Sequence, residues 1–143
     1  MFPNTKMFSY RTLFVLMLMT VTLSSGVPPH GSFYKNSKDS KYCLEVAWVP
    51  LQSDLLIIVD RGEDQVRSAA LNFLEGPGAD VYRVSGEKIV HKLYEAFLKS
   101  CKERVGLKLA DGDLSTFAYA RSNGTMKTKL LGKQATFRSG QCP

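Results

Sequence analysis

The stretch LSTFAYARSNGTMKTKLLGKQATFR, residues 114–138, decides the fold class of this chain. Within it, Ser122-Asn123-Gly124 is a strong hairpin signal, because Asn-Gly accepts the left-handed backbone that a tight turn needs. Gly132-Lys133-Gln134 marks a second turn, and Phe117 and Tyr119 fall on one face of the segment before the first turn. We therefore expect an antiparallel meander of three strands, over residues 114–121, 126–131 and 135–138.

Strands are also expected earlier in the chain. Apolar residues recur at every second position of part of 42–49, with Leu44, Val46 and Trp48 on one side, and Pro50 ends this pattern. The apolar run at 55–59 (LLIIV) suits a strand that is covered on both faces. Residues 81–84 form a short further strand, so the sheet begins well before the meander.

Two stretches have the spacing of amphipathic helices. Acidic Glu63 and Asp64 suit the start of a first helix, which Gly76-Pro77-Gly78 ends; its apolar members are Val66, Ala69, Ala70, Phe73 and Leu74. A second helix covers residues 86–104 and is closed by Gly106; its wide stripe consists of Ile89, Val90, Leu93, Tyr94, Phe97, Leu98, Cys101 and Val105. The predicted fold class is α+β, with an antiparallel sheet packed on one or two helices.

The N-terminus has the features of a secretory signal peptide. Lys6 and Arg11 precede an apolar run at 13–23, and Ser24-Ser25-Gly26 offers small residues before a cut after Gly26. The alternative is a membrane anchor, but a run this short spans only about half of a bilayer core. We assign 1–26 to the signal peptide, 27–41 to a flexible lead-in rich in Pro, Gly, Ser and Lys, and 42–143 to a single α+β domain.

Composition and charge exclude some classes of protein and leave others open. The chain has 143 residues, of which 44% are hydrophobic and 22% charged, so wholesale disorder is excluded. Loss of Lys6 and Arg11 with the signal peptide lowers the formal net charge from +6 to +4. That mild charge is weak support for nucleic-acid binding by itself.

The three cysteines all lie beyond the signal peptide, in an oxidising route. One disulfide and one free thiol is the economical assignment. Cys101 occupies a core position of the second predicted helix, where a free cysteine acts as a small apolar residue. Cys43 and Cys142 lie near the two ends and are the favoured pair; the alternative is that Cys101 pairs with one of them.

Candidate catalytic groups are few. His30 lies in the lead-in, whereas His91 has Glu87 and Glu95 four residues before and after it, a spacing that can orient a general base. The same spacing is ordinary on helix surfaces. The sequence has no zinc-type spacing or phosphate-cradling loop, and Asp111-Gly112-Asp113 lacks the further ligands of calcium. We expect no catalytic residues, no metal and no cofactor.

Two polar features remain. Asn123-Gly124-Thr125 is a glycosylation sequon at a hairpin tip, although Asn-Gly also explains the turn itself. A basic set near the end of the chain offers contacts to RNA phosphates or to a protein partner, with an aromatic ring for stacking; its members are Tyr119, Arg121, Lys127, Lys129, Lys133 and Arg138. The alternative is a solvated sheet face.

The positions of Tyr42-Cys43 and Cys142 match a known plan. With a signal peptide, a helix and an antiparallel sheet, the chain resembles the ribonuclease-like secreted effectors of powdery mildew fungi. Phe117 to Cys142 is also similar to the last hairpin and terminal cysteine of small fungal guanyl-specific ribonucleases. The resemblance implies a ribonuclease-like fold with an end-to-end bridge from Cys43 to Cys142.

The resemblance also implies a function. Active fungal ribonucleases of this type use histidine, glutamate and arginine, and the terminal hairpin here holds no histidine, so a catalytically dead scaffold is implied. The protein would be a monomeric secreted virulence effector that binds a host protein or RNA inside plant cells and can be recognised by an immune receptor. One alternative is a small secreted active ribonuclease or toxin that uses His91 with Glu87 or Glu95. Another is a secreted binding module without a fungal link.

Overall fold

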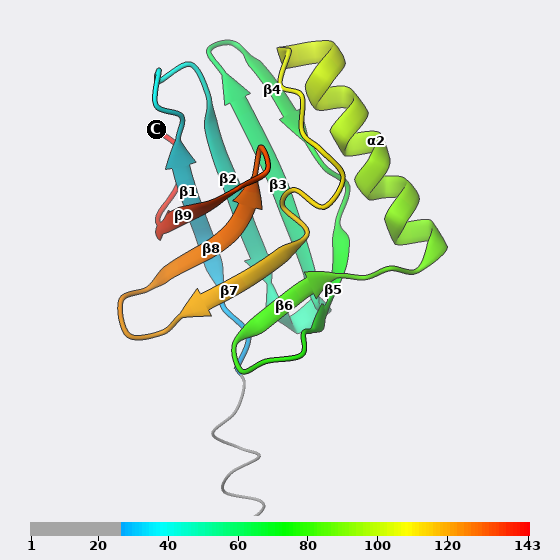
Figure 1. The fold of residues 1–143 in the computed structure, drawn as a ribbon, viewed down its shortest axis with the longest axis vertical. Helices are drawn as coiled ribbons and strands as arrows, with labels where there is room; N and C mark the ends of the chain where they lie inside the picture. Colours follow the sequence, from blue (N-terminus) through cyan, green and yellow to red (C-terminus); the bar gives the residue numbers. More distant parts are fainter. Residues whose placement is uncertain (1–26) are drawn as a thin grey trace, which may run out of the picture.

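Nine strands and one α-helix make up residues 27–143, the part of the chain that the computed structural model describes (Figure 1). The strands are β1 (Gly31–Asn36), β2 (Cys43–Val49), β3 (Asp54–Arg61), β4 (Asp64–Arg67), β5 (Leu71–Glu75), β6 (Val81–Val84), β7 (Thr116–Ala120), β8 (Thr125–Leu130) and β9 (Lys133–Ser139). The helix is α2 (Lys88–Val105), and a single helical turn, Pro50–Gln52, joins β2 to β3.

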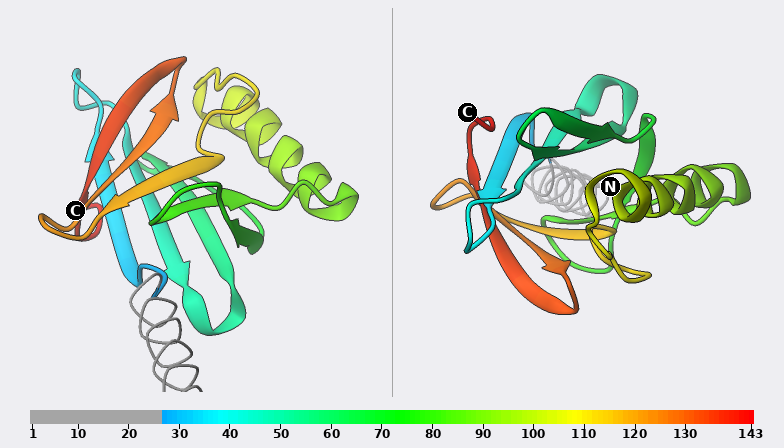
Figure 2. Two further views of the ribbon diagram at one scale, coloured as in Figure 1. Left: turned by 60° about the horizontal axis from the view of Figure 1, so that its bottom comes forward. Right: turned by 90° about the horizontal axis from the view of Figure 1, so that it is seen from above.

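Eight of the strands close into an antiparallel barrel. Their order is β2-β1-β9-β8-β7-β6-β5-β3, and the pairing of β2 with β3 completes the ring. β4 adds to one half of the edge of β3 and β5 to the other half. Figure 2 shows that α2 lies outside the barrel, on one side of it.

The barrel interior is filled by the inward-facing side chains of alternate strand positions. Trp48 packs edge-to-face against Phe73, Tyr82 and Phe117, with ring centroids 4.9–5.8 Å apart. Burial of each large apolar side chain stabilises the fold by about 1.5–3 kcal/mol. Other fully buried members of the core are Val46, Leu55, Ile57, Val59, Leu71, Met126 and Phe137.

The helix predicted over 86–104 is confirmed as α2, which packs against β4 and β5. Its buried residues recur every three or four positions; they are Val90, Tyr94, Phe97, Cys101 and Val105. Ile89 is 75% exposed, so the buried stripe is narrower than expected. Gly106 ends the helix with φ 71°, a conformation that glycine adopts without a steric penalty.

The predicted ribonuclease-like α+β fold is wrong, because the strands close into a barrel. The closing strand, β1, lies inside the lead-in predicted over 27–41, so the prediction that this segment lacks a regular element is also wrong. Only Phe33 is fully buried among the residues of β1, and one inward apolar residue gives almost no alternation to detect. The signal peptide predicted over 1–26 lies outside the described residues.

The helix predicted from Glu63 onward is wrong as well, since this segment forms β4 and β5. The buried positions are Val66, Ser68, Leu71 and Phe73, whereas Ala69 and Ala70 are exposed. Alternate burial at 66 and 68, and again at 71 and 73, is a strand pattern with a break between the strands. Within residues 27–143, no helix is long and apolar enough to cross a membrane.

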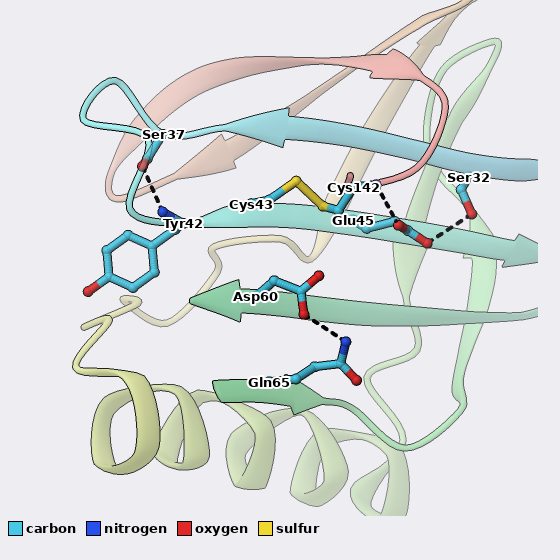
Figure 3. The surroundings of a disulfide bond; sticks show 8 residues. All are labelled: Ser32, Ser37, Tyr42, Cys43, Glu45, Asp60, Gln65 and Cys142. Atoms are coloured by element: carbon cyan, nitrogen blue, oxygen red, sulfur yellow. Dashed lines mark hydrogen bonds between the residues drawn. A yellow bond between two sulfur atoms is a disulfide. The ribbon is translucent and has the colours of Figure 1, made fainter. Parts of the chain in front are cut away.

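The predicted Cys43–Cys142 disulfide is confirmed, and Cys101 is a buried free thiol. In Figure 3, the chain end with Cys142 lies beside β2, where the Cys142 N–H donates to Glu45 Oε1 (2.9 Å). The Ser32 hydroxyl of β1 donates to the other oxygen of Glu45 (3.2 Å).

These contacts lie at the seam where the barrel closes. β1 and β9 pair through two positions only, Phe33 with Ser139 and Tyr34 with Arg138. Beyond the strand, the Gly140 N–H donates to the Ser32 carbonyl (2.9 Å). The disulfide therefore fixes the segment that follows β9 to the second strand of the ring and reinforces the short β1–β9 pairing.

Candidate functional site

One end of the barrel opens into a cavity of about 750 Å³. The connection between β1 and β2, the turn between β8 and β9, and the segment after α2 surround it. This end of the barrel is at the top in Figure 1, and the right-hand view of Figure 2 looks down on the same end. We call this cavity the mouth. It has an apolar floor of Leu44, Leu107, Leu130 and Ala135, and a polar rim that includes Lys35, Lys38, Asp39 and Lys133.

Strand alternation places the lysines at the mouth. Lys35 follows Phe33 on the inward face of β1 and stands opposite Leu44 of β2. Lys133 begins β9 with the same parity as inward-facing Ala135 and stands opposite Leu130. Apolar residues fill these inward positions deeper in the barrel, and lysines replace them at its end. A lysine can lie along an apolar wall with its methylene stem while its ammonium group stays in water.

The buried carboxylate of Asp113 holds one side of the rim in place. It accepts hydrogen bonds from the backbone N–H groups of Ala110 (2.8 Å), Leu131 (3.0 Å) and Gly132 (3.2 Å). The carboxylate thus joins the segment after α2 to the β8–β9 turn, where Leu131 has the left-handed φ of 53°. Three hydrogen bonds from N–H donors offset part of the cost of burying this carboxylate.

Tyr94 anchors the same loop from the helix. Its hydroxyl donates to the Asp113 carbonyl (2.5 Å) and accepts from the Gly112 N–H (3.1 Å). Burial raises the pKa of Tyr94 to about 12. The phenol therefore stays neutral and keeps its proton for the bond to Asp113 at physiological pH.

The opposite side of the rim is tied to the end of α2. The Tyr42 hydroxyl and the Arg61 guanidinium both donate to the Val105 carbonyl, at 3.0 and 2.8 Å. The guanidinium also lies over the Tyr42 ring, 5.5 Å from its centroid. These contacts satisfy a carbonyl at the C-terminal end of the helix, where positive charge is favourable.

The rim has more positive than negative charge. Asp39 accepts bonds from the Ser37 hydroxyl (2.6 Å) and the Lys41 N–H (3.2 Å), and the Ser37 bond lowers the pKa of Asp39. Among the described residues, Lys35, Lys38 and Lys133 form no salt bridge. Three ammonium groups therefore remain available beside one carboxylate that is already hydrogen-bonded within its own loop.

The structure divides the predicted basic set between several places. Lys127 and Lys129 are exposed on the outer face of β8, and Arg138 stands opposite Thr125 on the same face. Lys133 instead lies at the mouth.

The other two members of the set form a separate cluster. Tyr119 packs edge-to-face on Phe33 at 5.8 Å, and the guanidinium of Arg121 lies 5.2 Å from the centre of the Tyr119 ring. The Arg121 guanidinium also bonds Asp80 (2.7 Å) and the Val27 carbonyl. Arg121 and Tyr119 therefore have structural partners already.

Asn123 lies exposed at the tip of the β7–β8 hairpin. Its side-chain oxygen accepts bonds from the N–H (3.2 Å) and the hydroxyl (2.6 Å) of Thr125. Asn123 therefore stabilises the β7–β8 turn, and its glycosylation stays a prediction.

His91 pairs with Glu95, at 2.6 Å between Nε2 and Oε1, and both side chains are about half exposed. Glu87 lies just before the helix and contributes its backbone carbonyl to the His91 N–H. A depression of about 160 Å³ adjoins His91 and includes Ser85 and Ser115. Across residues 27–143, no group of three His, Cys, Asp or Glu side chains is placed to hold a metal ion.

Sequence reasoning missed the mouth because Lys35 and Lys38 fell in the supposed lead-in. One signal was available: Lys133 has the same parity as Ala135 and Phe137, which marks it as inward-facing if the strand is begun two residues earlier. No family model, curated protein or solved structure matches this chain.

Proposed function

We propose that this chain is a non-catalytic binding protein whose ligand enters the mouth of the barrel. The observation that carries the proposal is the cavity of about 750 Å³ with an apolar floor and a few charged groups at its rim. Ligand pockets typically have volumes of about 300–1,000 Å³ and this division between apolar lining and a few polar groups. Eight-stranded barrels are also wide enough to hold one small ligand.

The arrangement around His91 supports a role without catalysis. The His91–Glu95 pair is solvated on an outer face of α2 beside a depression of only about 160 Å³. The nearby hydroxyls have structural partners, since Ser85 accepts from the Glu87 N–H and Ser115 donates to the Gly112 carbonyl. A general base needs a substrate proton within hydrogen-bond reach, and a shallow solvated site holds a substrate poorly.

A neutral fluorescent probe tests the proposal. N-phenyl-1-naphthylamine should brighten on binding to the wild type, and Ala135→Trp, which fills the mouth, should abolish the increase. Thr116→Trp places the same indole side chain at an exposed position of β7 and should leave the increase unchanged. Circular dichroism checks that both variants are folded. Equal brightening with Ala135→Trp, or none with the wild type, would contradict the proposal.

For the biological role, we keep the proposal of a secreted virulence effector that acts in plant cells on a host protein and can meet an immune receptor. The Cys43–Cys142 bridge supports only the secretion step of this proposal, because disulfides persist in oxidising compartments. The proposal does not include a ribonuclease-like scaffold. Expression of the full chain in yeast tests secretion. The protein in the medium should begin at Val27, and retention inside the cells with Met1 intact would refute secretion.

RNA binding is a second candidate, favoured by the shared outer face of Lys127, Lys129 and Arg138. In gel-shift titrations across salt concentrations, replacing both lysines with alanine should reduce the salt dependence of RNA affinity. The matched control replaces Lys99 and Lys102 of α2 with alanine. If both pairs behave alike, the lysines of β8 belong to an ordinary solvated face.

A further inference from the structure

We infer that the ligand of the mouth is a single-chain amphiphile with an anionic head group, an inference that rests on the proposed binding function. Its apolar chain lies on the floor of the mouth, and its head group lies among the rim lysines. The shape of the site, its charge and the rigidity of its rim support this assignment separately.

The floor selects an apolar chain. Leu44, Leu130 and Ala135 come from three strands of the barrel wall, and Leu107 comes from the segment after α2. Leu131 stands at the rim with 54% of its surface exposed. An exposed leucine beside an apolar cavity extends the apolar path outward, so that part of a chain emerging from the cavity remains covered.

The rim selects a negative head group. Lys35 lies on β1, Lys38 on the connection to β2, and Lys133 at the start of β9, so the ammonium groups reach the opening from two sides. Asp39 is the carboxylate among the lining residues, and it is already engaged by Ser37 and the Lys41 N–H. A carboxylate or phosphate brought to this rim meets lysines that have no salt-bridge partner among the described residues.

The rim is preorganised rather than loose. The buried Asp113 carboxylate holds the N–H groups of Leu131 and Gly132, immediately before Lys133. On the far side, Tyr42 is tied to the end of α2 through the Val105 carbonyl. Fixing the rim before the ligand arrives reduces the ordering cost of binding.

Calorimetric titration with four compounds tests the head group and the chain. Dodecanoate, dodecyl phosphate and neutral dodecanol share one chain length, and acetate lacks the chain. The two dodecyl anions are used below their micelle concentrations, and dodecanol is used below its solubility limit. Both dodecyl anions should bind about tenfold more tightly than dodecanol, and acetate should not bind measurably. The stronger of the two anions identifies the preferred head group.

Variants separate the rim from general charge. Lys35→Gln with Lys133→Gln should weaken dodecanoate about tenfold and change dodecanol less than twofold. Lys127→Gln with Lys129→Gln removes the same charge from the outer face and should change neither affinity.

Three outcomes would overturn the inference. Equal affinities for dodecanol and the anions would refute the preference for an anionic head group but would leave the proposed binding function intact. Equal losses in both double variants would show attraction to net charge alone. No binding of any dodecyl compound, together with no response to the neutral probe, would remove the binding function as well.

Discussion

Asp113 shows how a single buried residue shapes the site. Asp113 is not among the residues that line the mouth. Its carboxylate nevertheless accepts hydrogen bonds from three N–H groups of two segments that meet there. The sequence motif Asp111-Gly112-Asp113 indicates a turn. Nothing in the motif reveals that its second aspartate reaches the β8–β9 turn, because that contact joins residues 18 positions apart.

Asp113→Asn tests this role. The amide group offers one acceptor oxygen and places donors against N–H groups, so the free energy of unfolding should fall by about 2–4 kcal/mol. Hydrogen exchange should accelerate at Leu131 and Gly132. Asp111→Asn is the matched control, since that carboxylate is exposed. Similar small effects in both variants would show that Asp113 does not hold the rim.

Tyr94 makes a prediction about alkaline pH. Burial raises the pKa of this phenol to about 12 in the folded protein, whereas in the unfolded chain it ionises near its ordinary pKa of 10.0. Its contribution to stability is therefore complete below pH 10 and is lost as the pH rises towards 12. Tyr94→Phe should cost about 1–3 kcal/mol at pH 8, because it leaves the Asp113 carbonyl and the Gly112 N–H unpaired.

The pH dependence supplies the check. Urea titrations of the wild type and Tyr94→Phe should show a stability difference that is constant to about pH 10 and narrows above it. A difference that stays constant up to pH 11 would mean that the phenol is not protected from ionisation in the folded protein.

At the scale of elements, the sequence predicts the segments with strong periodicity and fails where two periods compete. The terminal meander and α2 were predicted within a few residues, since their apolar positions fit one period only. Val66, Ala69, Ala70 and Phe73 fit a helix as well. The pairing of β4 and β5 with β3 decides in favour of strands. β4 follows β3 directly as a hairpin, whereas β5 pairs with the far end of β3, Asp54 with Asn72 and Leu55 with Leu71.

Ser68 lies at the break between β4 and β5 and tests this correction. Its hydroxyl accepts from the Ile57 N–H (2.9 Å) and donates to the Ala69 carbonyl (2.8 Å), so it replaces a missing ladder contact. Ser68→Ala should lower the free energy of unfolding by about 1–3 kcal/mol, measured by urea titration. Ser122→Ala, at an exposed turn, should change it by less than about 0.5 kcal/mol. Equal effects would favour the helical interpretation.

At the scale of the whole molecule, cysteine placement was predictable and closure of the barrel was not. Cys43–Cys142 follows from the positions of three cysteines and the core role of Cys101. Closure requires β1, whose sequence is mostly polar. The candidate site depends on closure, because the mouth exists only where β1, β2, β8 and β9 meet around one axis. The basic residues predicted as a single set are for the same reason divided between the inside and the outside of the ring.

The disulfide should matter most at the seam. Replacing Cys43 and Cys142 with serine opens a loop with a sequence separation of 99 residues and should lower the free energy of unfolding by up to about 4.7 kcal/mol. The amides of Phe33 and Tyr34 should then lose protection from hydrogen exchange before the rest of the barrel. Cys101→Ala leaves the bridge intact and should spare the seam. Unchanged protection in the double variant would show that the strand pairing closes the barrel unaided.

The most direct test of the binding role is an amide chemical-shift map recorded while dodecanoate is titrated into the labelled protein. The largest shifts should fall at residues 35–42 and 130–136 and at Leu107, with little change at the opposite end around Pro50–Gln52. Largest shifts around Ser85, His91 and Ser115, or on the exposed helix face at Ile89 and Leu93, would contradict a ligand site in the mouth of the barrel.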